Sequence, residues 1–406
     1  MSTTIISSIK QYVPQWIINT FFHLPKAIIA NIRYGFPARE IKVVGITGTK
    51  GKTTTSHLIY HILKENKKRT ILISTIAAKF GTKEIDTGFH VTTPDPFALQ
   101  KLLRQAVRQG YEYAVLEVTS SGLDQYRVWG IPFEIGVLTN ITPDHIDYHK
   151  TMTAYTNAKG KLLQVAKYAV INNQYRDNQE LNRLLDHSKP LVYFDGGKSA
   201  LEANQNAATT VATLLNISGK VAKKLLNTFP GVAGRFETVY DKDFQVVIDF
   251  AHTPESLQVA LTVLRARVKN KGKLIALFGS AGLRDPGRRR MGEVAAKYSD
   301  FFIITADDPR TETVENISNE IAGYAKKAGA KQFSGSISKS VKLPPHRYTC
   351  IPDRQTGINT AINLANKGDV IGLFGKGHEQ SMCYGTTEQP WSEHNAVKKA
   401  LEHRFK

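Results

Sequence analysis

Residues 41–55 read IKVVGITGTKGKTTT and combine an apolar run, a glycine-rich turn and a Lys-Thr pair. The apolar residues from Ile41 to Ile46 predict a buried strand, and the residues after Lys52 continue at helical spacing. A strand, a glycine-rich turn and a helix N-terminus form a phosphate cradle, because backbone N–H groups point into the turn and the helix adds partial positive charge. We therefore predict a nucleoside triphosphate site at this turn.

The residue types in the turn indicate how phosphates and a metal ion are held. A lysine at position 52 can reach the outer phosphates, and the hydroxyl of Thr53 can hold Mg²⁺. The spacing departs from GxxxxGKT, since Gly48 lies three residues before Gly51 and Gly45 lies six before it. A glycine-rich turn that binds nothing is the alternative, but the strand, glycines, lysine and threonine in order argue against it.

Composition limits the class of protein and its partners. The chain has 406 residues, and 54 basic against 35 acidic residues give a net charge of +19. This length predicts two domains with ordinary cores, and the positive balance suits anionic partners such as phosphorylated substrates. No aromatic residues interleave with the basic ones as in a nucleic-acid site. The two cysteines, Cys350 and Cys383, exclude a disulfide scaffold. We expect a cytoplasmic monomer that binds small molecules and no nucleic acid.

Residues 1–40 differ from the rest of the chain. They are rich in Ile, Phe, Trp and Tyr, and Pro14 and Pro25 are expected to break them into short helices. No run reaches the length of a bilayer span, and no signal-peptide cleavage site follows. Two interpretations stay open: packing on the next domain, which we favour, and peripheral contact with an anionic membrane surface.

Strand and helix patterns alternate along the remaining chain. They predict an α/β fold with a P-loop central domain and a mostly parallel sheet over residues 41–233, followed by a Rossmann-like α/β domain over residues 234–406. The boundary is placed at FPGVAG, residues 229–234. Polar clusters follow the predicted strands, and the carboxyl ends of parallel strands are where sites form in such folds.

Three polar clusters belong to the central domain. Glu117 follows the strand AVLEV, and Asp144 and His145 follow VLTNITPDH, so they could complete a Mg²⁺ sphere or simply be hydrogen-bonded in loops. The run Thr92-Thr93-Pro94 suits a phosphate or carboxylate, or caps the helix that follows it. Lys159 lies on a predicted helix, where a lone lysine is typically a solvated surface residue.

The second domain also places charged residues after its strands. They are Arg284-Asp285 after GSAG, the run DDPR at residues 307–310, and GKGHE at residues 375–379. Two arginines that converge on one crevice would clamp a carboxylate, whereas two surface salt bridges would contribute little. Asp249 and His252 in VIDFAHTP indicate nucleotide contacts or a hinge.

Ten motifs, in this order, resemble those of the Mur ligase family, ATP-dependent amide ligases of peptidoglycan precursor synthesis. They are GITGTKGKTTT, TTPDP, LEVTSSGLDQYRV, TNITPDHIDYH, AKGKLL, GRFE, DFAHTPESL, FGSAGLRD, DDPRTE and GKGHE. The resemblance extends over residues 41–394. It does not extend to the uridine-binding domain that precedes the P-loop in the family. Lys50 and His394 also stand where the family more often has Asn and Arg.

The resemblance implies a role for individual residues. The implied ATP contacts are Gly48, Thr49, Lys50, Gly51, Lys52, Thr53, Thr54, Asn140, Arg235, Asp249 and His252. The implied Mg²⁺ ligands are Thr53, Glu117, His145 and Lys159, the last as the carbamate that the family forms on this lysine. Lys52, Glu117, His145 and Lys159 are the implied catalytic residues. The implied acceptor contacts are Thr92, Thr93, Thr119, Gln125 and Arg127, and the implied amino-acid contacts are Arg284, Asp307, Asp308, Arg310, Gly375 and Glu379.

The implied reaction joins an amino acid to a carboxylate. ATP phosphorylates the carboxylate, the amine attacks the acyl phosphate, and phosphate leaves. The expected acceptor is UDP-MurNAc-L-Ala-D-Glu, and the arginine of DDPR resembles family members that add meso-diaminopimelate, whose distal carboxylate needs a cation. Two alternatives remain: a related ligase with another carboxylate acceptor, of polyglutamate or cyanophycin type, or a non-catalytic ATP-binding subunit of a Mur-like complex.

Overall fold

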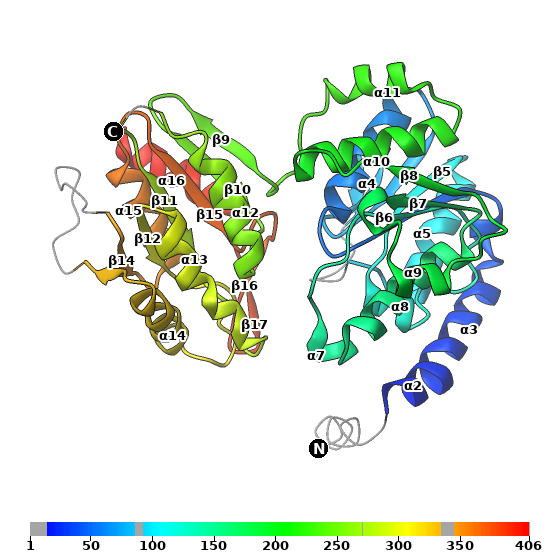
Figure 1. Ribbon diagram of the computed structural model, residues 1–406, viewed down its shortest axis with the longest axis horizontal. Coiled ribbons are helices and arrows are strands. Elements are labelled where there is room, and N and C mark those ends of the chain that lie inside the picture. Colours follow the sequence, from blue (N-terminus) through cyan, green and yellow to red (C-terminus); the bar gives the residue numbers. More distant parts are fainter. Residues whose placement is uncertain (1–13, 86–91, 270, 334–344, 406) are drawn as a thin grey trace. The chain divides into compact units, whose positions relative to one another are not determined.

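The computed structural model describes residues 14–85, 92–269, 271–333 and 345–405. The chain divides into two compact units, Met1–Pro230 and Gly231–Lys406. Each unit is built on its own mostly parallel β-sheet with helices on both faces (Figure 1). The predicted α/β class is therefore confirmed.

The first unit contains an eight-stranded sheet in the order β4-β3-β2-β5-β1-β6-β7-β8. Its strands are β1 (Lys42–Thr47), β2 (Thr70–Ile73), β3 (Ala78–Phe80), β4 (Lys83–Ile85), β5 (Tyr113–Glu117), β6 (Phe133–Leu138), β7 (Tyr168–Asn172) and β8 (Leu191–Phe194). All neighbouring pairs are parallel except β2–β3 and β3–β4. Because β1 lies between β5 and β6, the glycine-rich turn after β1 is flanked by the loops that follow these two strands.

Helices cover both faces of this sheet. Those of the first unit are α2 (Gln15–Ile18), η1 (Asn19–His23), α3 (Leu24–Tyr34), η2 (Pro37–Arg39), α4 (Lys52–Glu65), α5 (Pro96–Arg108), α6 (Ser120–Asp124), α7 (Ile146–His149), α8 (Met152–Val165), η3 (Asn173–Tyr175), α9 (Gln179–Leu184), α10 (Ala200–Leu214) and α11 (Gly219–Leu226). Val44 of β1 packs with α4, α10 and α11 in one core, and Val43 packs with α5 and α8 in the other. This division follows from the alternation of side chains along a strand.

The segment before β1 is helical from Gln15 to Tyr34 without interruption, so the prediction that Pro25 breaks it was wrong. The turn η1 before the proline is π-helical, and the N–H of Leu24 donates to the carbonyl of Asn19. Pro25 lies at the start of α3, where its missing N–H is tolerated. As we expected, α3 packs on the first unit, against α5. Within the described ranges, no helix is long and apolar enough to cross a membrane.

The second unit contains a seven-stranded sheet in the order β13-β14-β12-β11-β15-β10-β9. Its strands are β9 (Glu237–Asp241), β10 (Gln245–Asp249), β11 (Leu274–Phe278), β12 (Phe301–Ile304), β13 (Lys331–Gln332), β14 (Arg347–Cys350) and β15 (Val370–Phe374). Only β9 is antiparallel to its neighbour. A separate hairpin joins β16 (Ser381–Tyr384) and β17 (Thr387–Pro390).

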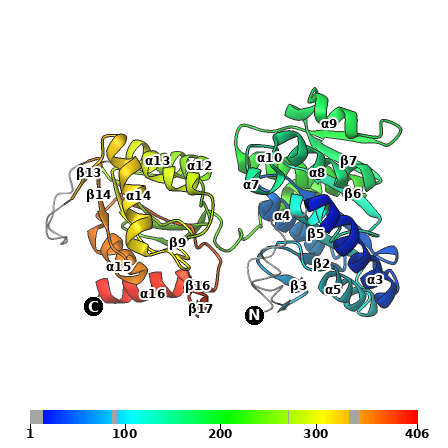
Figure 2. The same ribbon diagram turned by 90° about the horizontal axis from the view of Figure 1, so that it is seen from below.

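Two groups of helices enclose the second sheet (Figure 2). They are α12 (Pro254–Arg265), η4 (Pro286–Arg290), α13 (Met291–Tyr298), α14 (Val314–Lys327), α15 (Arg354–Leu364) and α16 (Glu393–Arg404). Residues of α12, α13 and α14 share a core with Val247, and residues of α15 and α16 share the opposite core with Val246. Because β10, β11, β12 and β15 are parallel, the loops that follow them leave the same edge of the sheet.

Candidate active site

The turn between β1 and α4 depends on two glycines. Gly48 has a φ of +150° and Gly51 a φ of +80°, a region that residues with a Cβ rarely adopt. A Cβ on Gly48 would lie 1.9 Å from Oγ1 of Thr139, and one on Gly51 would lie 2.5 Å from Oδ1 of Asn204. The turn is thus closely packed and needs glycine at both positions, and α4 begins directly after it.

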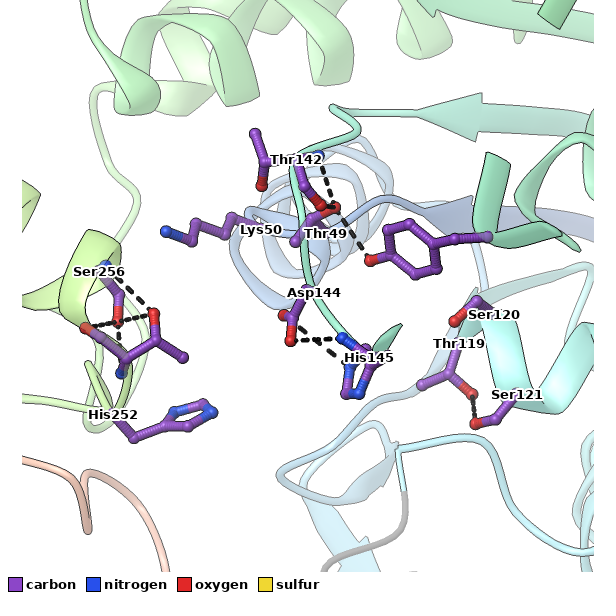
Figure 3. A network of polar contacts seen from close by, with 12 residues as sticks. Thr49, Lys50, Thr119, Ser120, Ser121, Thr142, Asp144, His145, His252 and Ser256 are labelled. Atoms are coloured by element: carbon purple, nitrogen blue, oxygen red, sulfur yellow. Dashed lines mark hydrogen bonds and ion pairs between the residues drawn. The ribbon is translucent and has the colours of Figure 1, made fainter. Parts of the chain in front are cut away.

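The loop after β6 holds this turn in shape. The N–H of Lys50 donates to Oδ1 of Asn140 at 2.8 Å, and Nδ2 of Asn140 donates to the carbonyl of Lys50 at 2.9 Å. Oγ1 of Thr49 donates to the carbonyl of Thr142 and accepts from its N–H at 3.0 Å (Figure 3). Asn140 therefore fixes the backbone of the phosphate-binding turn.

Lys52 and Thr53 occupy the first turn of α4, and Thr54 beside them is half-buried. The ammonium of Lys52 donates to the carbonyls of Gly48 and Thr49, both at 2.9 Å. Oγ1 of Thr53 donates to Oε1 of the buried Glu117 at 3.0 Å. The Lys52 ammonium therefore contacts the glycine-rich turn, and the Thr53 hydroxyl contacts the Glu117 carboxylate.

Thr53 and Glu117 offer oxygen atoms, which suit a hard divalent cation such as Mg²⁺. His145, the third implied ligand, is half-exposed and lies beside Asp144, with 3.9 Å between Nε2 and Oδ2 (Figure 3). Within the described ranges, no group of three or more His, Cys, Asp and Glu side chains is arranged so that it could hold a metal ion. The hydrogen bond between Thr53 and Glu117 brings two of the implied ligands together.

Tyr155 links several of these residues. Its hydroxyl forms a hydrogen bond of 3.0 Å with Oγ1 of Thr49, and its ring centre lies 4.3 Å from Nζ of Lys159 and 6.3 Å from the imidazole of His145. The sequence analysis did not select it. The only available signal was its position one helical turn before Lys159 on α8, which places both side chains on one helix face.

Lys159 is 1% exposed, so the expectation of a solvated surface lysine from its position alone was wrong. Burial lowers the pKa of Lys159 well below its ordinary value, the Lys52 ammonium lowers it further, and Asp144 opposes both. A lysine in these surroundings favours the neutral amine, which is a nucleophile.

The implied acceptor residues form one hydrogen-bond network. Oγ1 of Thr93 lies 3.1 Å from Oγ1 of Thr119 and accepts from the N–H of Thr119. Arg127 donates from Nη1 to the carbonyl of Thr93 and from Nε and Nη2 to Oε1 of Gln125. Oγ1 of Thr92 accepts a hydrogen bond of 3.1 Å from Oγ1 of Thr75. The structure thus brings all five of these residues to one edge of the sheet.

A pocket of about 280 Å³ adjoins this network. Its lining comes from the N-terminal helix, the start of α5 and the loop after α6: His23, Lys26, Asp95, Pro96, Ala98, Gln125 and Arg127. Lys26 forms an ion pair of 2.5 Å with Asp95. The segment before the P-loop therefore contributes a wall to the pocket that holds Arg127.

In the second unit, a buried lysine organises the loops after β12 and β15. Lys376 is fully buried, and its ammonium lies 2.8 Å from Oδ1 of Asp308 and 2.6 Å from Oε2 of Glu379. Burial alone would lower the pKa of Lys376, but the carboxylates of Glu379, Asp307 and Asp308 raise it. Burial raises the pKa of Asp307 to about 6, although Lys376 and Arg354 oppose it.

Gly375 is required for this packing. Its φ is +104°, and a Cβ there would lie 2.1 Å from Oδ2 of Asp307. Arg310 has a φ of +56°, and its backbone pairs with the β16–β17 hairpin through Cys383 and Gly385. Nε of Arg310 is buried and, among the described residues, has no hydrogen-bond partner. This guanidinium therefore retains a buried donor.

Arg354 is the largest fully buried side chain described in the chain. It forms a bidentate pair with Glu393, with Nη2 2.6 Å from Oε1 and Nε 3.0 Å from Oε2. Its remaining donors reach the carbonyls of Ala306 at 3.0 Å and Phe374 at 2.8 Å. These carbonyls immediately precede Asp307 and Gly375, so Arg354 ties together the two loops of this site. Sequence reasoning missed it.

Three other predicted residues of this unit, Arg235, Asp249 and His252, lie around the end of strand β10. Asp249 accepts from the N–H groups of Phe236 and Ala251, and burial raises the pKa of its carboxyl, which Arg235 opposes. The Arg235 guanidinium lies 4.4 Å from the ring centre of Phe250, and Nδ1 of His252 contacts the Phe250 carbonyl. These four groups surround the end of β10.

The side chain of Arg284 is exposed. Its loop adjoins the DDPR loop, because the N–H of Gly282 donates to the carbonyl of Asp308 at 3.0 Å. The structure therefore brings together the two loops that carry Arg284 and Arg310.

A glycine-rich turn beside a buried lysine in one unit, and a buried cluster of a lysine with carboxylates in the other, are features of a nucleotide-dependent enzyme of two α/β units. Residues 46–238 match the model of the Mur ligase middle domain. Residues 234–377 match that of the glutamate ligase domain of Mur ligases. The chain belongs to the Mur ligase family, whose members form amide bonds with hydrolysis of ATP.

Curated relatives match most of the chain. The UDP-N-acetylmuramoyl-L-alanyl-D-glutamate--2,6-diaminopimelate ligase of Trichormus variabilis is 36% identical, over 94% of this chain and 81% of the relative. The ligase of the same name from Aquifex aeolicus is 34% identical, over 91% and 79%. A solved structure of a ligase of that name gives a TM-score of 0.59 at 27% identity, over 90% and 79% of the two chains.

A more distant structure shares the fold. FolC of E. coli, solved in complex with DHPP and ADP, gives a TM-score of 0.68 at 15% identity and covers 94% of this chain and 93% of its own. The fold of this chain is therefore shared with FolC of E. coli.

Proposed function

We propose that this protein is an ATP-dependent ligase that joins meso-diaminopimelate to UDP-MurNAc-L-Ala-D-Glu, through an acyl phosphate of the D-glutamate side chain. The observation that carries the proposal is the pairing of two sites in one chain. One unit has a P-loop beside a buried lysine, and the other has a buried cluster of charged residues from DDPR and GKGHE. The names of relatives above 30% identity support the choice of substrates.

The first unit supplies the phosphoryl-transfer residues. Lys52 lies against the turn, where its ammonium can move from the Gly48 and Thr49 carbonyls to the outer phosphates of ATP. Thr53 and Glu117 would hold a divalent cation, Mg²⁺ in our proposal, which when bound offsets negative charge on the transferring phosphoryl group. Thr93, Thr119 and Arg127 would hold the acceptor carboxylate in line with the phosphate.

The buried environment of Lys159 suits covalent modification of its amine better than it suits an ion pair of its ammonium. Burial lowers the pKa of Lys159 and so favours its neutral amine, which can attack carbon dioxide, forming an N–C bond and releasing one proton to give a carbamate. The product is an anion that would attract a cation, in place of an ammonium that would repel it. We propose that the carbamate of Lys159 completes the metal site with Thr53, Glu117 and His145.

The second unit supplies the pocket for the amine substrate. Asp307, Asp308 and Glu379 would bind its ammonium groups, and Arg310, which keeps a buried donor, would bind the distal carboxylate. Arg284 and Gly375 would border the same pocket. Arg235, Asp249 and His252 would contact the nucleotide.

A ligase assay tests the proposal directly. Purified full-length protein is given ATP, Mg²⁺, UDP-MurNAc-L-Ala-D-Glu and either meso-diaminopimelate or L-lysine, and products are identified by mass spectrometry. We expect a tripeptide product with diaminopimelate, and at least about tenfold lower kcat/KM with lysine, since one lost carboxylate contact costs about 1.4 kcal/mol or more. Phosphate release with a polyglutamate-type acceptor, and none with the UDP-muramoyl dipeptide, would contradict the proposal.

The variant Arg310→Ala tests whether Arg310 binds the amine substrate specifically or affects the activity of the whole enzyme. We expect it to raise KM for diaminopimelate and to leave the affinity for ATP unchanged. Arg290→Ala, which removes an exposed arginine paired with Glu293, is the matched control and should behave as the unsubstituted protein. Equal effects of the two substitutions would remove Arg310 from the pocket.

A further inference from the structure

The helical segment Gln15–Tyr34 is amphipathic in an unusual sense. The residues that it buries against the first unit are small or polar: Asn19, Ala27, Ala30 and Asn31. The residues that it exposes are large and apolar: Trp16 is 64% exposed, Phe21 72%, Phe22 61%, Ile29 56% and Ile32 64%. A helix that only packed on its own domain would show the opposite pattern.

Four of the exposed residues, together with Pro25, form one continuous stripe. Phe22, Pro25, Ile29 and Ile32 recur at i, i+3, i+7 and i+10, and Phe21 lies beside them. This spacing places them on one helix face, along a segment about 30 Å long. We call Phe21, Phe22, Pro25, Ile29 and Ile32 the apolar stripe. No other helix of the described chain exposes so many large apolar side chains.

Polar contacts fix the opposite face to the protein. Nδ2 of Asn19 donates to Oδ2 of Asp124 at 2.7 Å, and Nδ2 of Asn31 donates to the carbonyl of Trp129 at 2.9 Å. Arg104 of α5 donates to the carbonyls of Tyr34 and Gly35, both at 2.8 Å. The segment therefore lies lengthwise along its unit, beside α5 (Figure 1). The side chains of the apolar stripe are exposed.

The charged residues of the N-terminal segment itself have one sign. Residues 1–39 contain no Asp or Glu, and they contain four Lys and Arg. Arg33 and Arg39 are exposed, and Lys26 is paired with Asp95. Aromatic and aliphatic residues on one face with basic residues at the margins are the composition of helices that lie in an anionic lipid interface.

The same charges disfavour other occupants. A second copy of the chain would bring two basic segments together, in a protein with a net charge of +19. Residues 1–13, which lie outside the described residues, carry Lys10 and no acidic residue, so they offer no complementary charge. We propose that the apolar stripe docks the protein on an anionic membrane surface, with Gln15–Tyr34 lying in the plane of the lipid headgroups.

Vesicle sedimentation with the full chain tests this proposal. The vesicles are phosphatidylcholine alone, or phosphatidylcholine in which about a third of the lipid is phosphatidylglycerol. We expect binding to the anionic vesicles that is at least about tenfold stronger than to neutral ones and weakened by salt, because the apolar stripe and the basic margin act together. The Trp16 contribution to tryptophan fluorescence, obtained by comparison with a Trp16→Phe variant, should shift to shorter wavelength on binding.

The variant Phe21→Ser/Phe22→Ser/Ile29→Ser should lose at least about nine-tenths of the bound fraction. The matched control is Val165→Ser/Leu201→Ser/Val221→Ser, which removes three exposed apolar side chains from the same unit and should bind as before. Both variants should keep the ligase activity on soluble substrates, which shows that they fold and separates this test from that of the proposed function.

Three results would overturn the proposal. Sedimentation that is equal for the stripe variant and the control would show that the stripe is not the contact. A concentration-dependent dimer that the stripe variant abolishes, without vesicle binding, would assign the stripe to a second copy. A large fall in thermal stability of the stripe variant alone, again without vesicle binding, would indicate that another part of the chain covers it.

Discussion

Tyr155 is the residue through which the phosphate-binding turn and Lys159 share a contact. Its hydroxyl bonds to Thr49, which in turn bonds to the backbone of Thr142, and its fully buried ring lies over the Lys159 amine. The hydroxyl and the ring therefore have separable functions, one in shaping the turn and one in enclosing the amine.

Two substitutions of Tyr155 separate these functions. Tyr155→Phe removes only the hydrogen bond, so we expect a loss of about 1 kcal/mol in the free energy of unfolding and a modest loss of ATP affinity. Tyr155→Leu also removes the ring, so we expect a further loss of about 2 kcal/mol and greater water access to Lys159. Denaturant unfolding and titration with a fluorescent ATP analogue provide the measurements. Identical behaviour of the two variants would mean that the ring contributes nothing.

Asp307 makes stability depend on pH in a defined direction. Its pKa rises from 3.8 to about 6 in the folded protein, so between these values the folded state binds more protons than the unfolded state. The free energy of unfolding should therefore fall as pH rises through this window, with the full penalty, on the order of 3 kcal/mol, present above pH 6. Asp307→Asn should lose this part of the pH dependence. Unfolding curves of both proteins from acid to neutral pH measure the difference, and parallel profiles would exclude the assignment.

Single residues also mark the limits of prediction from sequence. The glycines, Lys52 and Thr53 were predictable because local order in the chain dictates a strand, a tight turn and a helix start. The burial of Lys159 was not, because it depends on Tyr155 and on β6, which lies beside α8 only in the folded sheet. The family resemblance, and no pattern in the residues themselves, implied its special role.

At the scale of elements, Arg354 and Glu393 connect structures that are distant in sequence. Arg354 begins α15, Glu393 begins α16, and the carbonyls that Arg354 binds end β15 and follow β12. The strands themselves could be predicted from their apolar runs. The order that makes β12 and β15 neighbours of β11 could not, because nothing in the local sequence specifies which strands pair.

The Arg354–Glu393 pair should affect stability and amine binding separately. Arg354→Met leaves the Glu393 carboxylate buried without its partner, so we expect a loss of about 3–5 kcal/mol. The double variant Arg354→Met/Glu393→Leu removes both charges and should recover much of that stability. It should not recover a normal KM for the amine, because the carbonyls of Ala306 and Phe374 still lack their donor. Full recovery of both quantities would mean that the pair has no positioning role.

At the scale of the whole molecule, the chain consists of two units with separate sheets and separate cores. Leu277 packs in a core made only of second-unit residues, and Ile135 packs in a core made only of first-unit residues. From the sequence alone we predicted two domains with a boundary at residues 229–234, where the alternation of strand and helix patterns restarts. It also follows that a cavity in one core should leave the other core intact.

Hydrogen exchange measured by mass spectrometry tests this independence. Leu277→Ala should cost about 2–5 kcal/mol and increase exchange in β11 and β15, while β1, β5 and β6 keep their protection. Ile135→Ala should give the converse pattern. If either substitution raised exchange equally in both sheets, the chain would unfold as one cooperative body, and the fitted free energies of the Tyr155, Asp307 and Arg354 variants would refer to the whole protein. If the patterns stay separate, each of those values refers to its own unit, and only probes placed in that unit report it.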